Sequence, residues 1–459
     1  MNQCLFVTSS RRLHIRAGAV YVVHEGKLMH IRTPRLLAMV ASLAAAASLV
    51  SAGGASAAEG EQPRGALIGT LSADDTAAPP KSAQIRRERV DTNIACNTIA
   101  PTARAGLGGA AKACVEIKPL ADFEAPPTAD HAVAANDACD ITQPGYATAT
   151  RFGTCLNGME ITYTLLNDKN AVVGTGLMNV ATSMTLSATK TTWNETATVK
   201  VISVTGQVKS LNISYDVGCT GGCSMTDARP WDGTKTLGVG GTATGTVTYN
   251  TPLASGGLAN VTSKHHMYVV ASGTIPVQPN VSWDNPWPIR CDNQVGANPG
   301  CVVPDVRANF EFSLAELGGA AATYGWAQNA LRDGAPLRRD PSEATAKTRR
   351  EYTCGSKSTD PFIYMDDVVP NDSCDEFPFA RSYEGGTNGA LCADIVPLYE
   401  NGQWMIYEAR ADKPVTGNEP CARGHVNNDD NSNAGLALGR YVQRDRVLDT
   451  EKYNVYVTN

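Results

Sequence analysis

The sequence predicts a multidomain, mainly β protein, in which an antiparallel β-sandwich over residues 142–315 precedes a small α+β domain over residues 335–459. Three observations lead to this prediction. Apolar and polar residues alternate along the middle of the chain, a helix-like pattern follows a polar cluster near the C-terminus, and an even number of cysteines follows an export signal. Roughly four hundred residues follow that signal, which is enough for two or three domains.

Residues 1–57 are predicted to be the export signal. Two arginines precede an apolar run at residues 36–50, and the small residues Ala55-Ser56-Ala57 then provide a typical cleavage site. The run is too short to be a membrane anchor. Met29 is the expected initiator, because the segment before the apolar run is unusually long. We therefore expect a secreted, extracellular protein with no membrane partner.

Cysteine usage agrees with export. The chain has 13 cysteines, and loss of Cys4 with the signal leaves 12, an even number that predicts a disulfide framework. Cys219 with Cys223, and Cys291 with Cys301, are expected to close local loops. Four more should hold the C-terminal domain together: Cys354, Cys374, Cys392 and Cys421. Zinc is the alternative for the first pair, but no second pair follows at finger spacing.

Residues 58–141 are rich in Ala, Thr, Pro and Asp and show little hydrophobic periodicity, which predicts a low-complexity segment. A propeptide, a linker to the cell wall and a partly ordered cap all fit this composition. The sequence does not choose among them.

The predicted β-sandwich consists of short alternating stretches, such as residues 158–166 and 197–204, separated by turns rich in Gly, Asn and Asp. In a secreted enzyme, such a module more often binds a ligand or separates other domains than catalyses a reaction. We therefore expect it to contact a cell wall or glycan. His265 and His266 form a tempting metal pair, but adjacent strand residues point to opposite faces.

Two polar clusters near the C-terminus carry the candidate chemistry. Asp375, Glu376 and Glu384 surround a short stretch of aromatic and proline residues, and Asp430 and Asn431 open an apparent helix. Oxygen ligands of this kind suit Mg²⁺, Mn²⁺ or Ca²⁺. Hydrolysis of a phosphodiester requires a base and a positive charge near the developing phosphorane. Together the clusters predict a metal-dependent site for that reaction.

Plainer interpretations exist for each cluster. Asp375 and Glu376 alone fit a surface turn, and Asp430 with Asn431 fits a helix N-cap. The spacing between the clusters favours a site, in which one strand carboxylate faces the metal and the other is left to hold an arginine. Glu400 and Asn401 are a weaker alternative metal pair, because no helix pattern follows them.

Basic residues near the clusters are candidates for substrate contact. Arg349 and Arg350 lie upstream of the acidic pair, and Arg440 lies on the predicted helix. His425 is a candidate to stabilise the phosphorane or to act as an acid, with a structural role as the alternative. The formal net charge of −6 argues against coating of the protein by nucleic acid, but not against local binding of one phosphate.

The two clusters together resemble the NucA/NucB-type secreted deoxyribonucleases. The shared pattern is Asp-Glu-aromatic-Pro-x-Ala at 375–380, Glu-Gly-Gly at 384–386 and Asp-Asn-x-x-Ala-Gly at 430–435. Several spaced elements occur in the same order, which makes the signal more specific than a lone motif. The resemblance covers only the C-terminal part of the chain.

This resemblance implies a ββα-metal arrangement, in which two strands and a helix present one divalent cation to DNA, contacted mainly through its phosphate backbone. Asp375 and Glu376 then stand at the general-base position, Glu384 is a further site carboxylate, and Asp430 with Asn431 is the metal-binding helix start. Which of Asp375 and Glu376 is the base stays open, as does the native cation.

The sequence departs from the family pattern at two places. Ser373 stands where the family has an arginine, which leaves one phosphate contact in doubt. A much longer segment separates the Glu-Gly-Gly and Asp-Asn elements. We interpret it as an insertion closed by Cys392 and Cys421 that shapes the substrate cleft.

Two other function classes remain. A non-catalytic adhesin would use the β-sandwich as its working part, and a glycosidase would use Asp375 or Glu376 with Glu384 as its carboxylate pair. The few aromatic residues near the pair make a sugar cleft the weaker of these. A monomer is expected in each case.

Overall fold

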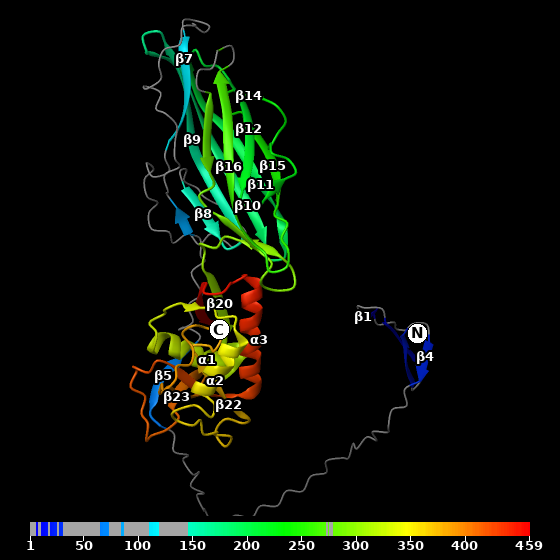
Figure 1. Ribbon diagram of the computed structural model, residues 1–459, viewed down its shortest axis with the longest axis vertical. Helices are drawn as coiled ribbons and strands as arrows, with labels where there is room; N and C mark the ends of the chain where they lie inside the picture. Colours follow the sequence, from blue (N-terminus) through cyan, green and yellow to red (C-terminus); the bar gives the residue numbers. More distant parts are fainter. Residues whose placement is uncertain are drawn as a thin grey trace, which may run out of the picture. The chain divides into compact units, whose positions relative to one another are not determined.

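The computed structural model describes residues 6–7, 11–16, 19–24, 27–30, 65–72, 84–86, 110–118, 146–271, 274 and 279–459 (Figure 1). The chain divides into two compact units, Met1–Glu61 and Gln62–Asn459. The first contains an antiparallel sheet of β1 (Phe6–Val7), β2 (Arg11–Arg16), β3 (Ala19–His24) and β4 (Lys27–His30). The apolar run and cleavage site of the predicted export signal lie outside the described residues. None of the described helices is long and apolar enough to cross a membrane.

Most strands of the second unit belong to two antiparallel sheets, which we call the two-sheet region. The larger sheet has the order β13-β15-β11-β10-β9-β8-β6, with β7 also paired to β9. Its strands are β6 (Gln84–Arg86), β7 (Ala110–Ile117), β8 (Tyr146–Thr150), β9 (Gly153–Asn167), β10 (Val172–Ser187), β11 (Lys190–Gly206), β13 (Ser224–Met225) and β15 (Thr242–Asn250).

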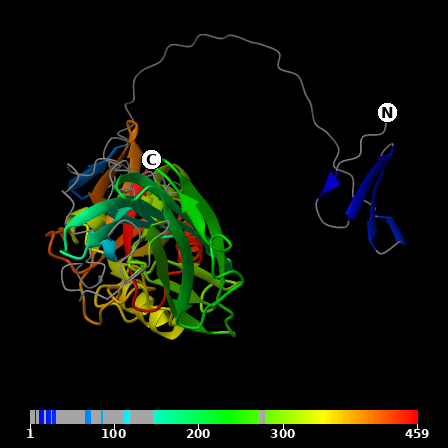
Figure 2. The same cartoon turned by 90° about the horizontal axis from the view of Figure 1, so that it is seen from above.

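The smaller sheet has the order β14-β12-β16-β18-β19, with β17 also paired to β16. Its strands are β12 (Leu211–Thr220), β14 (Lys235–Leu237), β16 (Leu258–Ala271), β17 (Asn280–Asp284), β18 (Ile289–Asp292) and β19 (Gly300–Val302). The strands curve around a common interior (Figure 2). Residues such as Met178 and Val199 of one sheet and Ile213 and Met267 of the other belong to a single hydrophobic core.

The alternation that predicted these strands also separates the two histidines of β16. His265 is buried in the core, where its Nδ1 lies 3.0 Å from the Tyr215 hydroxyl and its Nε2 lies 3.4 Å from Glu195. Burial lowers the pKa of His265 to about 3, so the ring is neutral at physiological pH. The His266 side chain is 44% exposed. The pair therefore cannot bind one metal ion between them.

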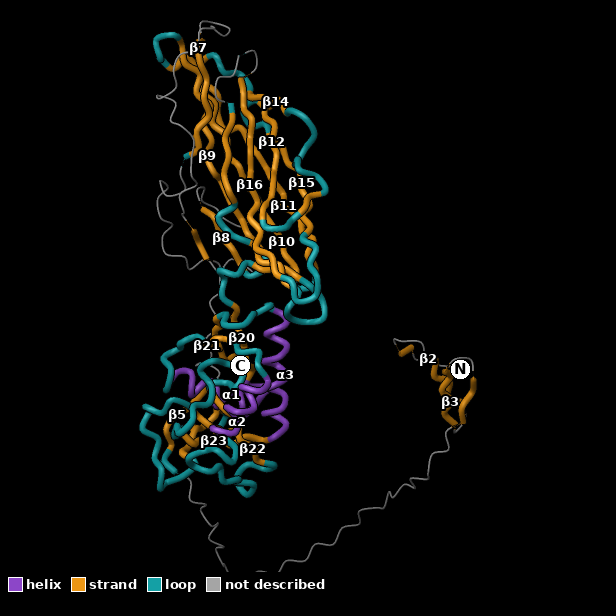
Figure 3. The backbone as a smooth tube through the Cα atoms, viewed as in Figure 1, coloured by secondary structure: helices purple, strands orange, loops and turns teal. Residues whose placement is uncertain are grey.

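The C-terminal region combines two small sheets with three helices, the only helices among the described residues (Figure 3). A five-stranded sheet has the order β22-β25-β23-β24-β5 and a three-stranded sheet the order β20-β26-β21. The strands are β5 (Leu67–Leu71), β20 (Ala308–Ser313), β21 (Leu337–Arg338), β22 (Asp372–Phe377), β23 (Ala393–Glu400), β24 (Gln403–Glu408), β25 (Ala422–Asn427) and β26 (Lys452–Thr458). The helices are α1 (Leu314–Ala330), α2 (Glu343–Thr353) and α3 (Asn428–Arg444).

Strand β5 comes from the segment in which the sequence predicts low complexity. It pairs antiparallel with β24 at the edge of the five-stranded sheet, beside the orange C-terminal strands in Figure 1. Leu71 is buried in the core of this region, and Gly69 lies against Trp326 of α1, 2.9 Å from where a Cβ would stand. Residues 67–71 are therefore part of the C-terminal fold, which is built from chain segments on both sides of the two-sheet region.

Four disulfides have both cysteines among the described residues, and all eight cysteines are ones that the sequence predicted to be in disulfides, although the pairing of Cys354 with Cys374 was not predicted. Cys219–Cys223 and Cys291–Cys301 close short loops in the two-sheet region. Cys354–Cys374 ties the end of α2 to β22, and Cys392–Cys421 closes the long segment between the two acidic clusters. The second of these pairs brings the starts of β23 and β25 together, next to the candidate site.

Buried arginines join the two-sheet region to the C-terminal region. Arg446, directly after α3, is 1% exposed and donates to the Asp292 carboxylate and to the carbonyl oxygen atoms of Ala188 at 2.6 Å and Asn298 at 2.9 Å. Arg151 donates to the carbonyl oxygen of Asp445 at 2.9 Å. Arg446 thus acts in the junction between the two regions.

Candidate active site

Strand β22 presents its adjacent acidic residues Asp375 and Glu376 to opposite faces of the five-stranded sheet. Asp375 pairs directly with Gly424 of β25, and Glu376 pairs with Arg423. Gly424 lies against α1, because a Cβ at this position would stand 2.2 Å from Thr323 Oγ1. Asp375 therefore faces α1 and Glu376 faces the other side of the sheet.

Asp375 is buried beneath α1 and is only 5% exposed. Its carboxylate accepts a hydrogen bond from the Tyr324 hydroxyl, while its Oδ2 atom is buried with no hydrogen-bond partner among the described residues. Burial is the main cause that raises the pKa of Asp375 well above its ordinary value, and the charges of Glu376 and Asp430 raise it further. Such a carboxylate has a free oxygen for a proton or a cation.

Helix α3 begins at the predicted Asp-Asn cluster. Asn427 is its N-cap, with a side-chain oxygen that accepts the backbone N–H of Asp429 at 2.8 Å. Asp430 Oδ2 accepts the backbone N–H of Gly319 at 3.1 Å, next to a kink in α1 where Gly318 has φ 47° and ψ −125°. Asp430 therefore caps the second part of α1 and holds the two helices together.

Asn431 connects α3 to β22. Its amide nitrogen donates to Ser373 Oγ at 3.2 Å and to the carbonyl oxygen of Cys374 at 3.1 Å. Both acceptors lie on the strand just before Asp375. Because the nitrogen is engaged, the amide oxygen is the Asn431 atom left to bind a cation.

Asp375, Asp430 and Asn431 thus come together where β22, α1 and α3 meet. Two carboxylates and one amide oxygen, completed by water, fit a hard divalent cation such as Mg²⁺ or Mn²⁺. The unpartnered Oδ2 of Asp375 leaves one ligand atom free for it. Among the described residues, no group of three or more His, Cys, Asp or Glu side chains is arranged to hold a metal by itself. A cation here would depend on the asparagine.

Glu376 lies on the reverse face beside α2. Its side chain is 15% exposed, and its Oε1 atom lies 3.6 Å from Nε of Arg350. Burial raises the pKa of Glu376, and the positive charge of Arg350 opposes that shift. One residue of the acidic pair thus faces the Asp-Asn cluster and the other holds an arginine.

Glu384 is held by Arg338 of strand β21. Its two carboxylate oxygens accept hydrogen bonds of 2.8 Å from the backbone N–H and from Nε of Arg338. In the same turn, Gly386 has φ 31° and packs on α2, since a Cβ there would lie 2.5 Å from the Arg349 carbonyl oxygen. This geometry favours an anchoring role, in which the Glu-Gly-Gly turn holds β21 and α2 in place.

His425 lies on the reverse face of β25 and is 1% exposed. Its Nδ1 lies 2.7 Å from Asp372 and its Nε2 lies 3.3 Å from Asp394, while its ring stacks on Phe362 at 4.2 Å. Burial by itself lowers the pKa of His425, but these two carboxylates outweigh it and the pKa is raised. Both ring nitrogens are engaged, which favours the structural role over the catalytic one.

The comparison with protein families bears on this site. Residues 324–404 match the family described as deoxyribonuclease NucA/NucB. The match confirms the family indicated by the sequence motifs and is consistent with a NucA/NucB-type domain in the C-terminal region. It includes Asp375, Glu376 and Glu384 and ends before Asp430 and Asn431. Searches of curated proteins and of solved structures gave no significant match.

The three predicted substrate arginines differ in accessibility. Arg349 has a side chain that is 11% exposed and ion-paired with Asp340 at 2.7 Å, so it supports the fold. Arg350 has a side chain that is 48% exposed and stands beside Glu376. Arg440 is exposed on α3. Arg350 and Arg440 are therefore the two that a DNA strand can reach.

Sequence reasoning missed two residues that matter in the NucA/NucB-type region. Tyr324 supplies the hydroxyl that holds Asp375. It was missed because an aromatic residue in an alanine-rich helix is usually interpreted as part of the hydrophobic core. Arg381 directly follows the Asp-Glu-Phe-Pro-Phe-Ala run. It is ion-paired with Glu343, the first residue of α2. Its position directly after the motif was the signal that could have found it.

Proposed function

We propose that this protein is a secreted, metal-dependent endonuclease that hydrolyses phosphodiester bonds of extracellular DNA with little sequence specificity. The observation that carries this proposal is the meeting of Asp375, Asp430 and Asn431 where β22, α1 and the start of α3 come together. The family match supports a deoxyribonuclease, a phosphodiester hydrolase. On this proposal, β22, β25 and the start of α3 form the ββα-metal unit of the nuclease, and the two-sheet region is its β-sandwich.

Each residue of the site receives a role from its environment. Asp375 is the general base that takes a proton from water, because its unpartnered Oδ2 can accept the proton while the Tyr324 hydroxyl holds the carboxylate in place. Asn431 and Asp430 hold the cation through their side-chain oxygens. The bound cation would supply positive charge for the phosphorane and the departing 3′ oxygen. Glu376 positions Arg350 for the phosphate.

Other features of the chain fit an extracellular enzyme. Four disulfides are typical of proteins that work in an oxidising environment. Contact with DNA through phosphates carries no sequence information, in keeping with low specificity. The β-sandwich is expected to bind cell wall or glycan, and the enzyme is expected to act as a monomer.

Digestion of supercoiled plasmid by the purified, oxidised protein tests this function. Nicking should occur with Mg²⁺ or Mn²⁺, with Ca²⁺ as a further arm, and should stop with EDTA. Asp375→Asn, which preserves side-chain volume, should remove the activity, and the exposed Asn433→Ala should retain it. Absence of cleavage with every cation, by protein shown to be folded, would support the non-catalytic adhesin instead.

A further inference from the structure

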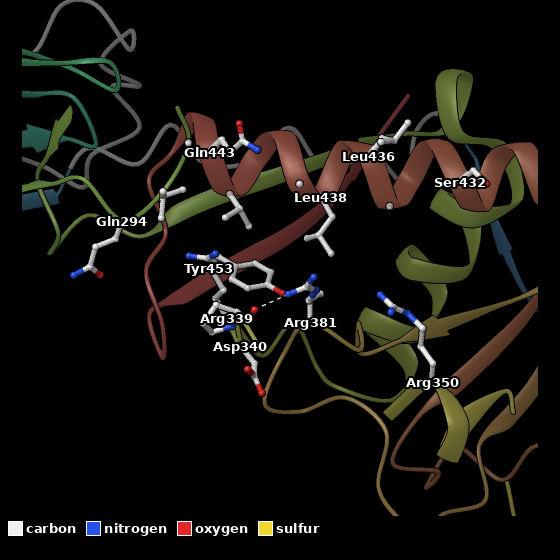
Figure 4. A pocket seen from close by; sticks show the side chains of 16 residues that line it. Gln294, Arg339, Asp340, Arg350, Arg381, Ser432, Leu436, Leu438, Gln443 and Tyr453 are labelled. Atoms are coloured by element: carbon white, nitrogen blue, oxygen red, sulfur yellow. Dashed lines mark hydrogen bonds between the residues drawn. The ribbon is translucent and has the colours of Figure 1, made fainter. Parts of the chain in front are cut away.

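A pocket with a volume of about 720 Å³ lies next to the candidate site (Figure 4). One wall is helix α3, which contributes Ser432, Gly435 and Gly439 from one face. The opposite wall carries three arginines, Arg339, Arg350 and Arg381, shown facing the helix in Figure 4. The volume falls within the range of about 300–1,000 Å³ that is usual for sites that bind small molecules or short segments.

The pocket adjoins the candidate site at the start of α3. Ser432 lines the pocket and directly follows Asn431. Arg350 lines the same end and reaches Glu376, on the side of the sheet opposite Asp375. Gln294, from the two-sheet region, lies at the end opposite Arg350 (Figure 4). A strand bound at Asn431 can therefore continue past Ser432 into this pocket.

The charge of the pocket is suited to an anion. Asp340 also lines it, but this carboxylate is neutralised by Arg349 at 2.7 Å. Arg350 and Arg381 share the counter-ion Glu343, which lies 3.5 Å from Arg350 and is also ion-paired with Arg381. Arg350 in addition lies 3.6 Å from Glu376. The Glu343 side chain is 68% exposed. An exposed ion pair of this kind is weak, so a phosphate can replace the carboxylate.

A polar group in the wall points to a ligand independently of the arginines. Tyr453 lines the pocket and is 1% exposed, and its hydroxyl is buried with no hydrogen-bond partner among the described residues. A buried hydroxyl without a partner is unfavourable, and a bound phosphate oxygen would supply the missing acceptor. On the helix wall, a Cβ at Gly435 or Gly439 would meet no atom within 4 Å. The glycines thus leave open space over the arginines.

We propose that this pocket binds a backbone phosphate of the DNA strand adjacent to the scissile bond, with Arg350 and Arg381 as its contacts and Glu343 as an exchangeable counter-ion. The inference rests on the proposed nuclease function and adds to it a subsite outside the metal centre. The open glycine face of α3 provides the room, and Tyr453 provides a donor in addition to the arginines. Phosphate contacts of this kind position the strand without reading its bases.

Binding of a labelled single-stranded deoxyoligonucleotide to Asp375→Asn protein, followed by anisotropy over a series of NaCl concentrations, tests the subsite. Gly435→Glu places a negative charge in the pocket without breaking a contact, and should weaken binding at least about tenfold. Gly435→Gln is its matched control and should change affinity less than about twofold. Asn433→Glu adds the same charge at an exposed position outside the pocket lining and should resemble Gly435→Gln.

Two further variants act in opposite directions. Arg381→Ala removes one phosphate contact and should lower the slope of log Kd against log salt by about one. Glu343→Gln removes the competing carboxylate and should tighten binding by about two- to fivefold. A merely structural role of Glu343 would give no gain in affinity.

The outcomes separate this inference from the proposed function. Equal affinity of Gly435→Glu and Gly435→Gln, in a protein whose Asp375 parent cleaves plasmid, overturns the subsite and leaves the nuclease standing. A parent protein that is folded but neither cuts nor binds DNA overturns both. A selective loss in Gly435→Glu together with a gain in Glu343→Gln establishes the subsite.

Discussion

The side-chain amide of Asn431 donates a hydrogen bond of 3.1 Å to the carbonyl oxygen of Cys374, the residue before Asp375. A second hydrogen bond, to Ser373 Oγ at 3.2 Å, fixes the same amide. The start of α3 is thereby held in register with β22, so that the candidate cation ligand and the candidate base cannot shift independently. Ser373 stands where the family pattern has an arginine, and here it serves this alignment.

Asn431→Ala should therefore reduce DNA cleavage by about 100-fold or more, because it removes a ligand oxygen and the two hydrogen bonds that orient the site. The reduction should be measured as kcat/KM on an oligonucleotide at saturating Mg²⁺. Asn433→Ala, two residues along the same helix and exposed, is the control and should keep wild-type activity. Full activity of Asn431→Ala would remove this residue from the site.

Asp375→Asn should abolish cleavage and at the same time stabilise the protein in the presence of a chelator. The raised pKa of Asp375 means that ionising this carboxylate costs more in the folded than in the unfolded chain. The stability that Asp375 contributes is therefore lost as the pH rises from its unfolded pKa of about 3.9 through its higher pKa in the folded protein. The amide that replaces this carboxylate in the variant does not titrate, so the variant avoids this loss. We expect a gain of about 0.5–2 kcal/mol at neutral pH by urea unfolding. A destabilised variant would contradict the assigned environment.

His425 should stabilise the fold in a pH-dependent manner. Its pKa is raised by Asp372 and Asp394, so the stabilisation is complete below the unfolded pKa of about 6.5 and is lost as the pH rises through the higher pKa of the folded protein. The difference in unfolding free energy between wild type and His425→Gln should thus be larger at acidic than at alkaline pH. A constant difference across this window would mean that His425 is neutral in the fold.

Breaking the junction at Arg446 should destabilise the protein by up to about 3–5 kcal/mol, because the buried Asp292 would keep only Arg290, whose Nε lies 3.5 Å away. Arg446→Met keeps similar volume, and denaturant unfolding measures the loss. The double variant with Asp292→Asn removes the under-compensated charge and should recover part of that stability. A loss below about 1 kcal/mol in the single variant would show that Arg290 alone is sufficient for this carboxylate.

Strand β5 should prove essential to the C-terminal region despite its distance along the sequence. Leu71→Ala, at a position only 6% exposed, should cost about 2–5 kcal/mol, and Leu67→Ala, at a position 48% exposed, should change stability by no more than about 0.5 kcal/mol. Both substitutions remove the same atoms from one strand, so the comparison isolates burial. Equal effects would mean that β5 does not dock on β24.

Local patterns were sufficient to predict much of this molecule. The alternating stretches became strands, the Asp-Asn cluster became a helix start, and Cys392 and Cys421 closed the long segment between the acidic clusters. These features depend on neighbours in the sequence or on a small number of partners. Side-chain alternation also anticipated that Asp375 and Glu376 would face opposite ways.

The pairing of strands far apart in the sequence could not be predicted in the same way. Nothing within residues 67–71 indicates that their partner lies at β24, because a short edge strand carries little periodicity. The roles of Glu384 and His425 likewise depend on Arg338, Asp372 and Asp394, which other elements bring to them. A motif predicts residue types at a site, but the partners of each side chain follow only from the fold.

The position of β5 has a consequence for the order in which the chain is made. Its partner β24 is synthesised only after the whole two-sheet region, and α3 follows later still. The C-terminal sheet therefore closes across a very long loop, a slow step that has to wait for most of the chain. A polypeptide interrupted before residue 403 lacks both β24 and the Asp-Asn helix start. Under the proposed function, a partly made copy would therefore have no complete site with which to cleave DNA.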